Sequence, residues 1–237
     1  METLLLLPGL DGTGRLFSPL LQELGHDFDL RPVAYPSDRV LGLDALAEHA
    51  RAFAPRASRY AIVAESFSGP IALKLAAADS RGLTALILVA TFVTPPIQGL
   101  LGAFVRAGAG VGMRLPVPLQ RWWSARWLTG GDTMLAGEVQ TATASVRPTI
   151  VASRLRLLTR VDVRRELVLC KVPMLYIAGE HDRLVTRAHH RELTRLRPDI
   201  AVRELPAPHL VLQTQPKLAA TEILRFAKPS RTHRGGP

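Results

Sequence analysis

Residues 61–73 read AIVAESFSGPIAL, an apolar run that passes directly into a segment with the composition of a helix. At the junction, Ser66 has the small residues Ala64 and Ser68 two positions away on either side. A nucleophile on a sharp strand-to-helix turn needs small neighbours, because the turn brings the strand and the helix close together. The pattern is A-x-S-x-S and not G-x-S-x-G, so two readings stay open for Ser66: a nucleophile, or the N-cap of the following helix. A helix N-terminus also supplies free backbone N–H groups, which suit a developing oxyanion.

Segments with strand and helix patterns alternate on both sides of this junction. We expect strands at 4–7, 29–35, 60–64, 85–89, 174–178 and 201–205, and helices at about 16–24, 43–53, 67–78, 187–196 and 216–226. Such alternation predicts an α/β fold, with a mostly parallel sheet of about six strands and helices on both faces. Residues 95–161 contain no clear strand and predict a helical insertion.

Length and composition favour one folded domain over residues 1–237. The chain has 47% hydrophobic and 21% charged residues, which is enough apolar material for a substantial core. Its single cysteine, Cys170, rules out an internal disulfide and a cysteine-ligated metal site, and it fits a reducing compartment. The apolar start, residues 1–7, lacks the features of a secretory signal, and no run reaches the length of a membrane span. We therefore expect a cytoplasmic protein without stable membrane insertion.

The net charge of +10 has two interpretations. It fits a phosphate-rich partner, an anionic surface or an acidic substrate. However, only four of the 30 basic residues are lysines, and the arginines are scattered along the chain, which is more typical of a compositional bias. We favour the second interpretation and expect no nucleic-acid partner.

A serine nucleophile needs a base, and the base needs an orienting acid. His209 follows the expected strand 201–205, and Asp182 follows the expected strand 174–178. Taken singly, His209 fits a surface loop and Asp182 fits a solvated turn. Together with Ser66 they all follow the carboxyl ends of expected parallel strands, where catalytic groups collect. Their order, Ser66, Asp182, His209, is the order found in α/β hydrolases.

These residues make the sequence resemble the α/β-hydrolase superfamily, particularly small bacterial esterases and lysophospholipase-like hydrolases. The resemblance runs from about residue 4 to 226 and rests on LLLLPGLDG at 4–12, AESFSG at 64–69, AGEHDRLV at 178–185 and PHL at 208–210. It implies an oxyanion hole formed by the backbone N–H groups of Leu10 and Phe67. Pro8-Gly9 stands where the family usually has His-Gly, so Asp11 is an alternative donor. The family's two leading antiparallel strands are expected to be absent.

By this resemblance the chain is expected to be a serine esterase that cleaves a small or medium acyl ester through an acyl-enzyme. Ser66 is the expected nucleophile, His209 the base and Asp182 its orienting acid, with no metal or organic cofactor. A thioesterase or lysophospholipase with the same triad, and a catalytically silent binding protein on the same fold, remain alternatives. Glu65 reads as a supporting group or as a plain polar neighbour of Ser66.

The insertion at about 95–161 is expected to form a cap over the site. Trp122, Trp123 and Trp127 are the expected pocket residues, with the cap core or contact with lipid as alternative roles. The sequence gives no indication of the oligomeric state.

Overall fold

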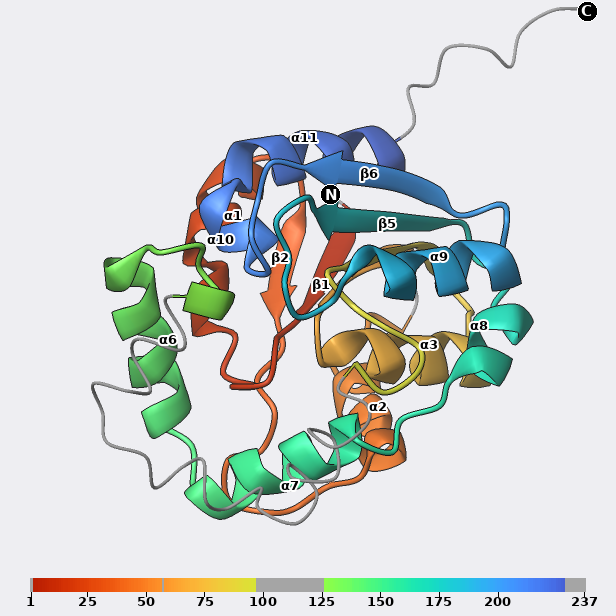
Figure 1. Ribbon diagram of the computed structural model, residues 1–237. Helices are drawn as coiled ribbons and strands as arrows, with labels where there is room; N and C mark the ends of the chain where they lie inside the picture. Colours follow the sequence, from red (N-terminus) through yellow and green to blue (C-terminus); the bar gives the residue numbers. More distant parts are fainter. Residues whose placement is uncertain (1, 57, 97–125, 229–237) are drawn as a thin grey trace, which may run out of the picture.

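The computed structural model describes residues 2–56, 58–96 and 126–228 (Figure 1). Within them lies one six-stranded sheet, in the order β2-β1-β3-β4-β5-β6, and every neighbouring pair is parallel. The strands are β1 Thr3–Leu7, β2 Asp29–Pro32, β3 Tyr60–Glu65, β4 Leu83–Val89, β5 Met174–Gly179 and β6 Ala201–Leu205. The expected parallel α/β sheet of six strands is therefore confirmed.

Helices follow the strands, because parallel neighbours need crossover connections. They are the short 3-10 helix η1 Arg15–Phe17 and α1 Ser18–Leu24, α2 Leu43–Arg51, α3 Ser68–Ala78, α6 Thr133–Ala144, α7 Pro148–Leu158, α8 Arg164–Leu169, α9 Arg187–Leu196, α10 Val211–Thr214 and α11 Pro216–Ala227. The helix expected at 16–24 is divided between η1 and α1, and the short helices α8 and α10 were not anticipated.

The sheet has an apolar core on each face. Alternate residues of a strand point to opposite faces, so Leu5 and Leu7 join one core while Leu4 and Leu6 join the other. Helices α2, α3, α8 and α9 cover the first face, and α1, α10 and α11 cover the second (Figure 1). Strands β1 and β3 each have a neighbour on both sides and are buried along their whole length, which is why they read as largely apolar runs.

β2 is shorter than expected, because the chain leaves the sheet after Pro32. The N–H of Tyr35 bonds to the carbonyl oxygen of Gly12, in the loop that follows β1. This edge segment therefore supports the loop after β1 and does not extend the ladder.

The described part of the expected insertion contains helices α6 and α7 and no strand. Both helices lie beyond the carboxyl ends of the strands (Figure 1). Residues Val146, Ile150 and Val151 pack against Leu10 of the loop after β1. The insertion thus meets the same edge of the sheet at which the candidate site residues were expected.

Candidate active site

The turn between β3 and α3 holds Ser66 in a strained conformation. Its φ is 49°, in the left-handed region that residues other than glycine rarely adopt. Such strain costs on the order of 1–3 kcal/mol and persists where surrounding contacts determine it. Here the N–H of Ser66 donates to the carbonyl oxygen of Val89 (2.9 Å), and the Ser66 carbonyl oxygen accepts from Thr91 Oγ1 (2.5 Å). These bonds hold Ser66 at the tip of the turn.

The small residues around the turn are closely packed by their neighbours. A Cβ atom added to Gly69 would lie 2.0 Å from Thr91 Oγ1, so only glycine fits between the helix and Thr91. Ala64 and Ser68 are fully buried. Ser68 stands at a position where the G-x-S-x-G pattern has glycine. Its hydroxyl bonds to the carbonyl oxygen of Pro8 and to the hydroxyl of Tyr35, the latter at 2.7 Å.

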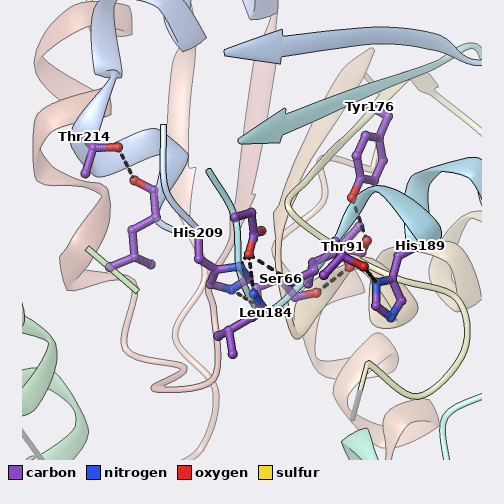
Figure 2. Close-up of polar contacts among 11 residues, drawn as sticks. Ser66, Thr91, Tyr176, Leu184, His189, His209 and Thr214 are labelled. Atoms are coloured by element: carbon purple, nitrogen blue, oxygen red, sulfur yellow. Dashed lines mark hydrogen bonds and ion pairs between the residues drawn. The ribbon is translucent and has the colours of Figure 1, made fainter. Parts of the chain in front are cut away.

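Ser66, His209 and Asp182 form one continuous chain of hydrogen bonds. His209 Nε2 lies 2.9 Å from Ser66 Oγ (Figure 2), and His209 Nδ1 lies 2.8 Å from Asp182 Oδ2. The side chains of His209 and Asp182 are 5% and 1% exposed. The loops that carry them are joined by the N–H of His181, which donates to the carbonyl oxygen of Ala207 (3.0 Å).

The surroundings of His209 settle its tautomer. A carboxylate accepts and cannot donate, so the proton of a neutral His209 resides on Nδ1 and leaves Nε2 as a free acceptor facing Ser66. Burial alone lowers the pKa of His209, but the charge and hydrogen bond of Asp182, with a smaller contribution from Glu65, raise it above its ordinary value. The arrangement therefore suits a base that accepts a proton from Ser66.

Glu65 is buried next to Ser66, and its side chain bonds to Gln213. Its Oε2 accepts a hydrogen bond from Gln213 Nε2 (3.3 Å). Burial raises its pKa to about 7, against the hydrogen bond from Gln213 and the charge of His209. Oε1 of Glu65 and Oε1 of Gln213 are both buried without a partner among the described residues. A protonated Glu65 would pair both oxygens, since the acid hydroxyl can donate to the amide oxygen.

The backbone around Ser66 includes N–H groups that have no acceptor in the part of the chain that the structure describes. Within the described ranges, no acceptor takes the N–H of Leu10, Asp11 or Phe67. Phe67 precedes α3, and Leu10 and Asp11 lie in the loop after β1, which contacts the Ser66 turn through Ser68 and Pro8. An oxyanion hole needs donors of this kind, already free and held by the fold.

Of the three expected pocket residues, only Trp127 belongs to the part that the structure describes, and Trp122 and Trp123 lie outside it. Trp127 is half-buried and lines a cavity of about 560 Å³ together with His181, Pro208 and Gln213. The cavity adjoins the loops of Asp182 and His209, because the lining residue His181 directly precedes Asp182 and the lining residue Pro208 directly precedes His209.

Three residues that support the site, Arg154, Thr91 and Gln213, were not anticipated from the sequence. Arg154 of α7 bonds to three carbonyl oxygens, those of Leu10, Asp11 and Pro36. The Thr91 hydroxyl donates to the carbonyl oxygen of Ser66, and the Gln213 amide donates to the Glu65 carboxylate. Thr91 follows the expected strand 85–89, so its position was a usable signal, whereas nothing in the local sequence distinguishes Arg154 from the other arginines.

Among the described residues, no three or more histidine, cysteine, aspartate or glutamate side chains are arranged to hold a metal ion. None of the described helices combines the length and the apolar character required to cross a bilayer.

No protein-family model matches the sequence, and a comparison with curated proteins finds no match. Solved structures do resemble the chain. A hydrolase from Oleispira antarctica superimposes with a TM-score of 0.83 at 15% identity, covering 97% of this chain and 92% of that one. An enol-lactonase from Burkholderia xenovorans superimposes with a TM-score of 0.78 at 18% identity, covering 95% of this chain and 90% of that one. An esterase from Thermogutta terrifontis superimposes with a TM-score of 0.77 at 18% identity, covering 95% of this chain and 89% of that one. The chain therefore has the α/β-hydrolase fold.

Proposed function

We propose that this α/β-hydrolase-fold chain is a serine hydrolase that cleaves carboxylic esters of small or medium acyl groups. The observation that carries the proposal is the unbroken chain of hydrogen bonds from Asp182 through His209 to Ser66, with Ser66 at a strained strand-to-helix turn. The hydrolases and esterases among the similar structures support the same reaction class.

In the proposed reaction, Ser66 Oγ attacks the ester carbonyl carbon and gives its proton to His209 Nε2. The carbonyl oxygen becomes an oxyanion, which the N–H groups of Leu10 and Phe67 stabilise. When the tetrahedral intermediate collapses, the bond to the leaving alcohol breaks and His209 returns the proton to that oxygen. Water, activated by His209, then attacks the acyl-enzyme in the same way and releases the acid. Asp182 keeps His209 in the required tautomer throughout and stabilises its charge when it is protonated.

The cavity beside the catalytic loops supports a small-molecule substrate. Its lining combines the apolar side chains of Trp127 and Pro208 with polar ones such as Arg183, and it adjoins the loop of His209. The cap expected at about 95–161 lies partly outside the described residues. We assign its described part, from residue 126 to 161, as a cap on a single domain, on the grounds that α6 and α7 lie beyond the carboxyl ends of the strands (Figure 1). The single, buried cysteine, Cys170, supports a reducing, cytoplasmic setting.

A fluorophosphonate probe, which reacts with activated serines, tests the proposal. The wild-type protein is expected to be labelled and to hydrolyse short- and medium-chain p-nitrophenyl esters. Ser66→Ala should lose both properties. Ser80→Ala is the matched control, because Ser80 is exposed and lies outside the site.

Labelling that persists in Ser66→Ala would refute Ser66 as the nucleophile. A folded wild-type protein that is neither labelled nor active on esters would favour the binding-protein alternative. Acyl thioesters and lysophospholipids, tested beside the esters, separate the substrate classes because only the leaving group differs.

A further inference from the structure

Every carbonyl oxygen of the loop Pro8 to Gly12 accepts a hydrogen bond. The Pro8 oxygen accepts a hydrogen bond from Ser68 Oγ, and the Gly9 oxygen accepts one from the N–H of Gly12 (3.1 Å). Arg154 Nη1 donates to the Leu10 oxygen (3.1 Å) and to the Asp11 oxygen (2.6 Å). The Gly12 oxygen accepts a hydrogen bond from the N–H of Tyr35 (2.8 Å). Only one of these five bonds, between Gly9 and Gly12, is internal to the loop. The loop therefore takes its shape from segments that lie elsewhere in the chain.

These bonds fix the direction of the unpaired N–H groups. A trans peptide is planar, and its N–H points opposite to its C=O. The N–H of Leu10 shares a peptide with the Gly9 oxygen, and the N–H of Asp11 shares one with the Leu10 oxygen. Holding those two oxygens thus turns the Leu10 and Asp11 donors away from Gly12 and Arg154. Both donors lack an acceptor in the described ranges.

Arg154 reaches the loop from α7 and is 2% exposed. Its guanidinium contacts three main-chain oxygens, and no carboxylate in the described part of the chain lies within ion-pair distance of it. Burying a cation costs free energy, and here the three carbonyl oxygens and the nearby charge of Asp11 offset part of that cost. Gly12 leaves the space for it: at φ +69° its added Cβ would lie 2.3 Å from Nη1.

Ser68 holds the other end of the loop. A hydroxyl has one proton, and the Pro8 oxygen can only accept, so Ser68 donates to Pro8 and the hydroxyl of Tyr35 donates to Ser68. The ring of Tyr35 lies 5.7 Å from the guanidinium carbon of Arg154. Ser68, Tyr35 and Arg154 thus form a continuous support behind the loop, which we call the brace.

We propose that Arg154 and Ser68 are positioning residues for the oxyanion loop: Arg154, through the Leu10 oxygen, directs the N–H of Asp11, and Arg154 and Ser68 together hold the two ends of the segment that carries the N–H of Leu10. Helix α7 would thereby control the chemical step of the reaction. This inference rests on the proposed hydrolase function. It distinguishes a role in transition-state stabilisation from a role in fold stability alone, and it gives the serine at position 68 a function that glycine would not supply.

Arg154→Lys tests the first half, because lysine keeps the charge but lacks the planar fork that reaches several oxygens. Loss of a whole oxyanion donor costs 10²–10³-fold in kcat, so misdirected donors are expected to lower kcat by roughly 10–100-fold. KM should stay within about twofold of the wild-type value, since no residue of the brace lines the cavity of about 560 Å³ beside the site. The rate of fluorophosphonate labelling should fall with kcat. Arg156→Lys, on the exposed side of the same helix, is the matched control and should leave both unchanged.

Ser68→Ala and Tyr35→Phe test the second half as a pair. Each removes one hydroxyl, but only Ser68→Ala removes the bond to the loop. Ser68→Ala is therefore expected to lower kcat by about tenfold, and Tyr35→Phe by clearly less. Thermal unfolding of every variant, measured alongside, reports stability separately.

Labelling of the wild-type protein decides the proposed function, and the ratios of variant to wild type decide this inference. A folded Arg154→Lys protein with wild-type kcat, or with an effect confined to KM, would overturn the role of Arg154. Should Arg154→Lys fail to fold, the Ser68 and Tyr35 pair carries the test. Equal kcat values in Ser68→Ala and Tyr35→Phe would then overturn the positioning role of Ser68.

Discussion

Asp182 holds His209 with one carboxylate oxygen and is itself held by the other. Oδ2 lies 2.8 Å from His209 Nδ1, while Oδ1 accepts the backbone N–H groups of Leu184 and Val185 at 2.8 and 2.9 Å. Since both oxygens are engaged, the carboxylate cannot rotate without losing a bond. Its orientation, and therefore that of His209, is determined by the loop that follows β5 Met174–Gly179.

Asp182→Asn should keep the fold and lower kcat by about 10³–10⁴-fold. An asparagine amide can donate to Nδ1, which places the imidazole proton on Nε2 and removes the acceptor that faces Ser66. Ester hydrolysis and circular dichroism measure the two effects. Glu180→Gln, an exposed neighbour, is the control. Activity within about tenfold of wild type would show that another carboxylate, with Glu65 the first candidate, orients His209.

The acid limb of the pH dependence of kcat/KM should have its midpoint above 6.5. His209 acts as a base only when neutral, and Asp182 raises its pKa above that ordinary value despite the opposing effect of burial. Activity is therefore lost as pH falls through the raised pKa. A profile recorded at constant ionic strength checks this, and a midpoint below 6.5 would contradict it.

Glu65→Gln should stabilise the protein at alkaline pH. Burial raises the pKa of Glu65 from 4.5 to about 7, so the folded state binds its proton more tightly than the unfolded state does. The associated stability is present below pH 4.5 and is lost as pH rises through about 7, a difference of about 3 kcal/mol. Glutamine does not titrate, and its amide can donate to the unpaired oxygen of Gln213.

The measurement is urea unfolding of wild type and Glu65→Gln at several pH values between about 5 and 8. The advantage of the glutamine variant should grow with pH, with activity largely retained. Glu138→Gln, at an exposed site on α6, should show no such trend. A constant difference across the range would mean that Glu65 is already ionised when folded.

Gly69→Ala should destabilise the protein by about 1–3 kcal/mol and also reduce kcat. The new Cβ would displace Thr91, whose hydroxyl bonds to the carbonyl oxygen of Ser66. Gly42→Ala is the matched control, because a Cβ at Gly42 meets nothing within 4 Å. Equal losses of unfolding free energy in the two variants would contradict this account of the turn.

The sheet was predictable from the sequence because its interior strands are short apolar runs bounded by turn residues, while the edge strands β2 and β6 keep only a partly apolar pattern. The errors occurred where other segments decide the structure. Residues 33–35 look like strand, yet the N–H of Tyr35 is taken by Gly12 and not by a strand. Helix α10 has only four residues, too few to show a helical period.

The candidate site likewise contains residues that the sequence indicated and residues that it did not. Ser66, Asp182 and His209 each follow a strand, so sheet topology alone indicated that they meet. Arg154 could not be found in this way, because its bonds to Leu10 and Asp11 span 144 and 143 residues and rest on how α7 packs. Trp122 and Trp123, proposed from composition, fall outside the described residues.

The same long separation bears on how the protein matures during synthesis. The loop at residues 8–12 and Ser66 leave the ribosome early, whereas the arginine that shapes the loop comes more than 140 residues after it. Chains are made from the N-terminus, and contacts between distant residues form late in folding. On the proposed function, a growing chain therefore carries Ser66 without a shaped oxyanion loop until α7 has been made and packed, and activity would begin only when most of the polypeptide exists.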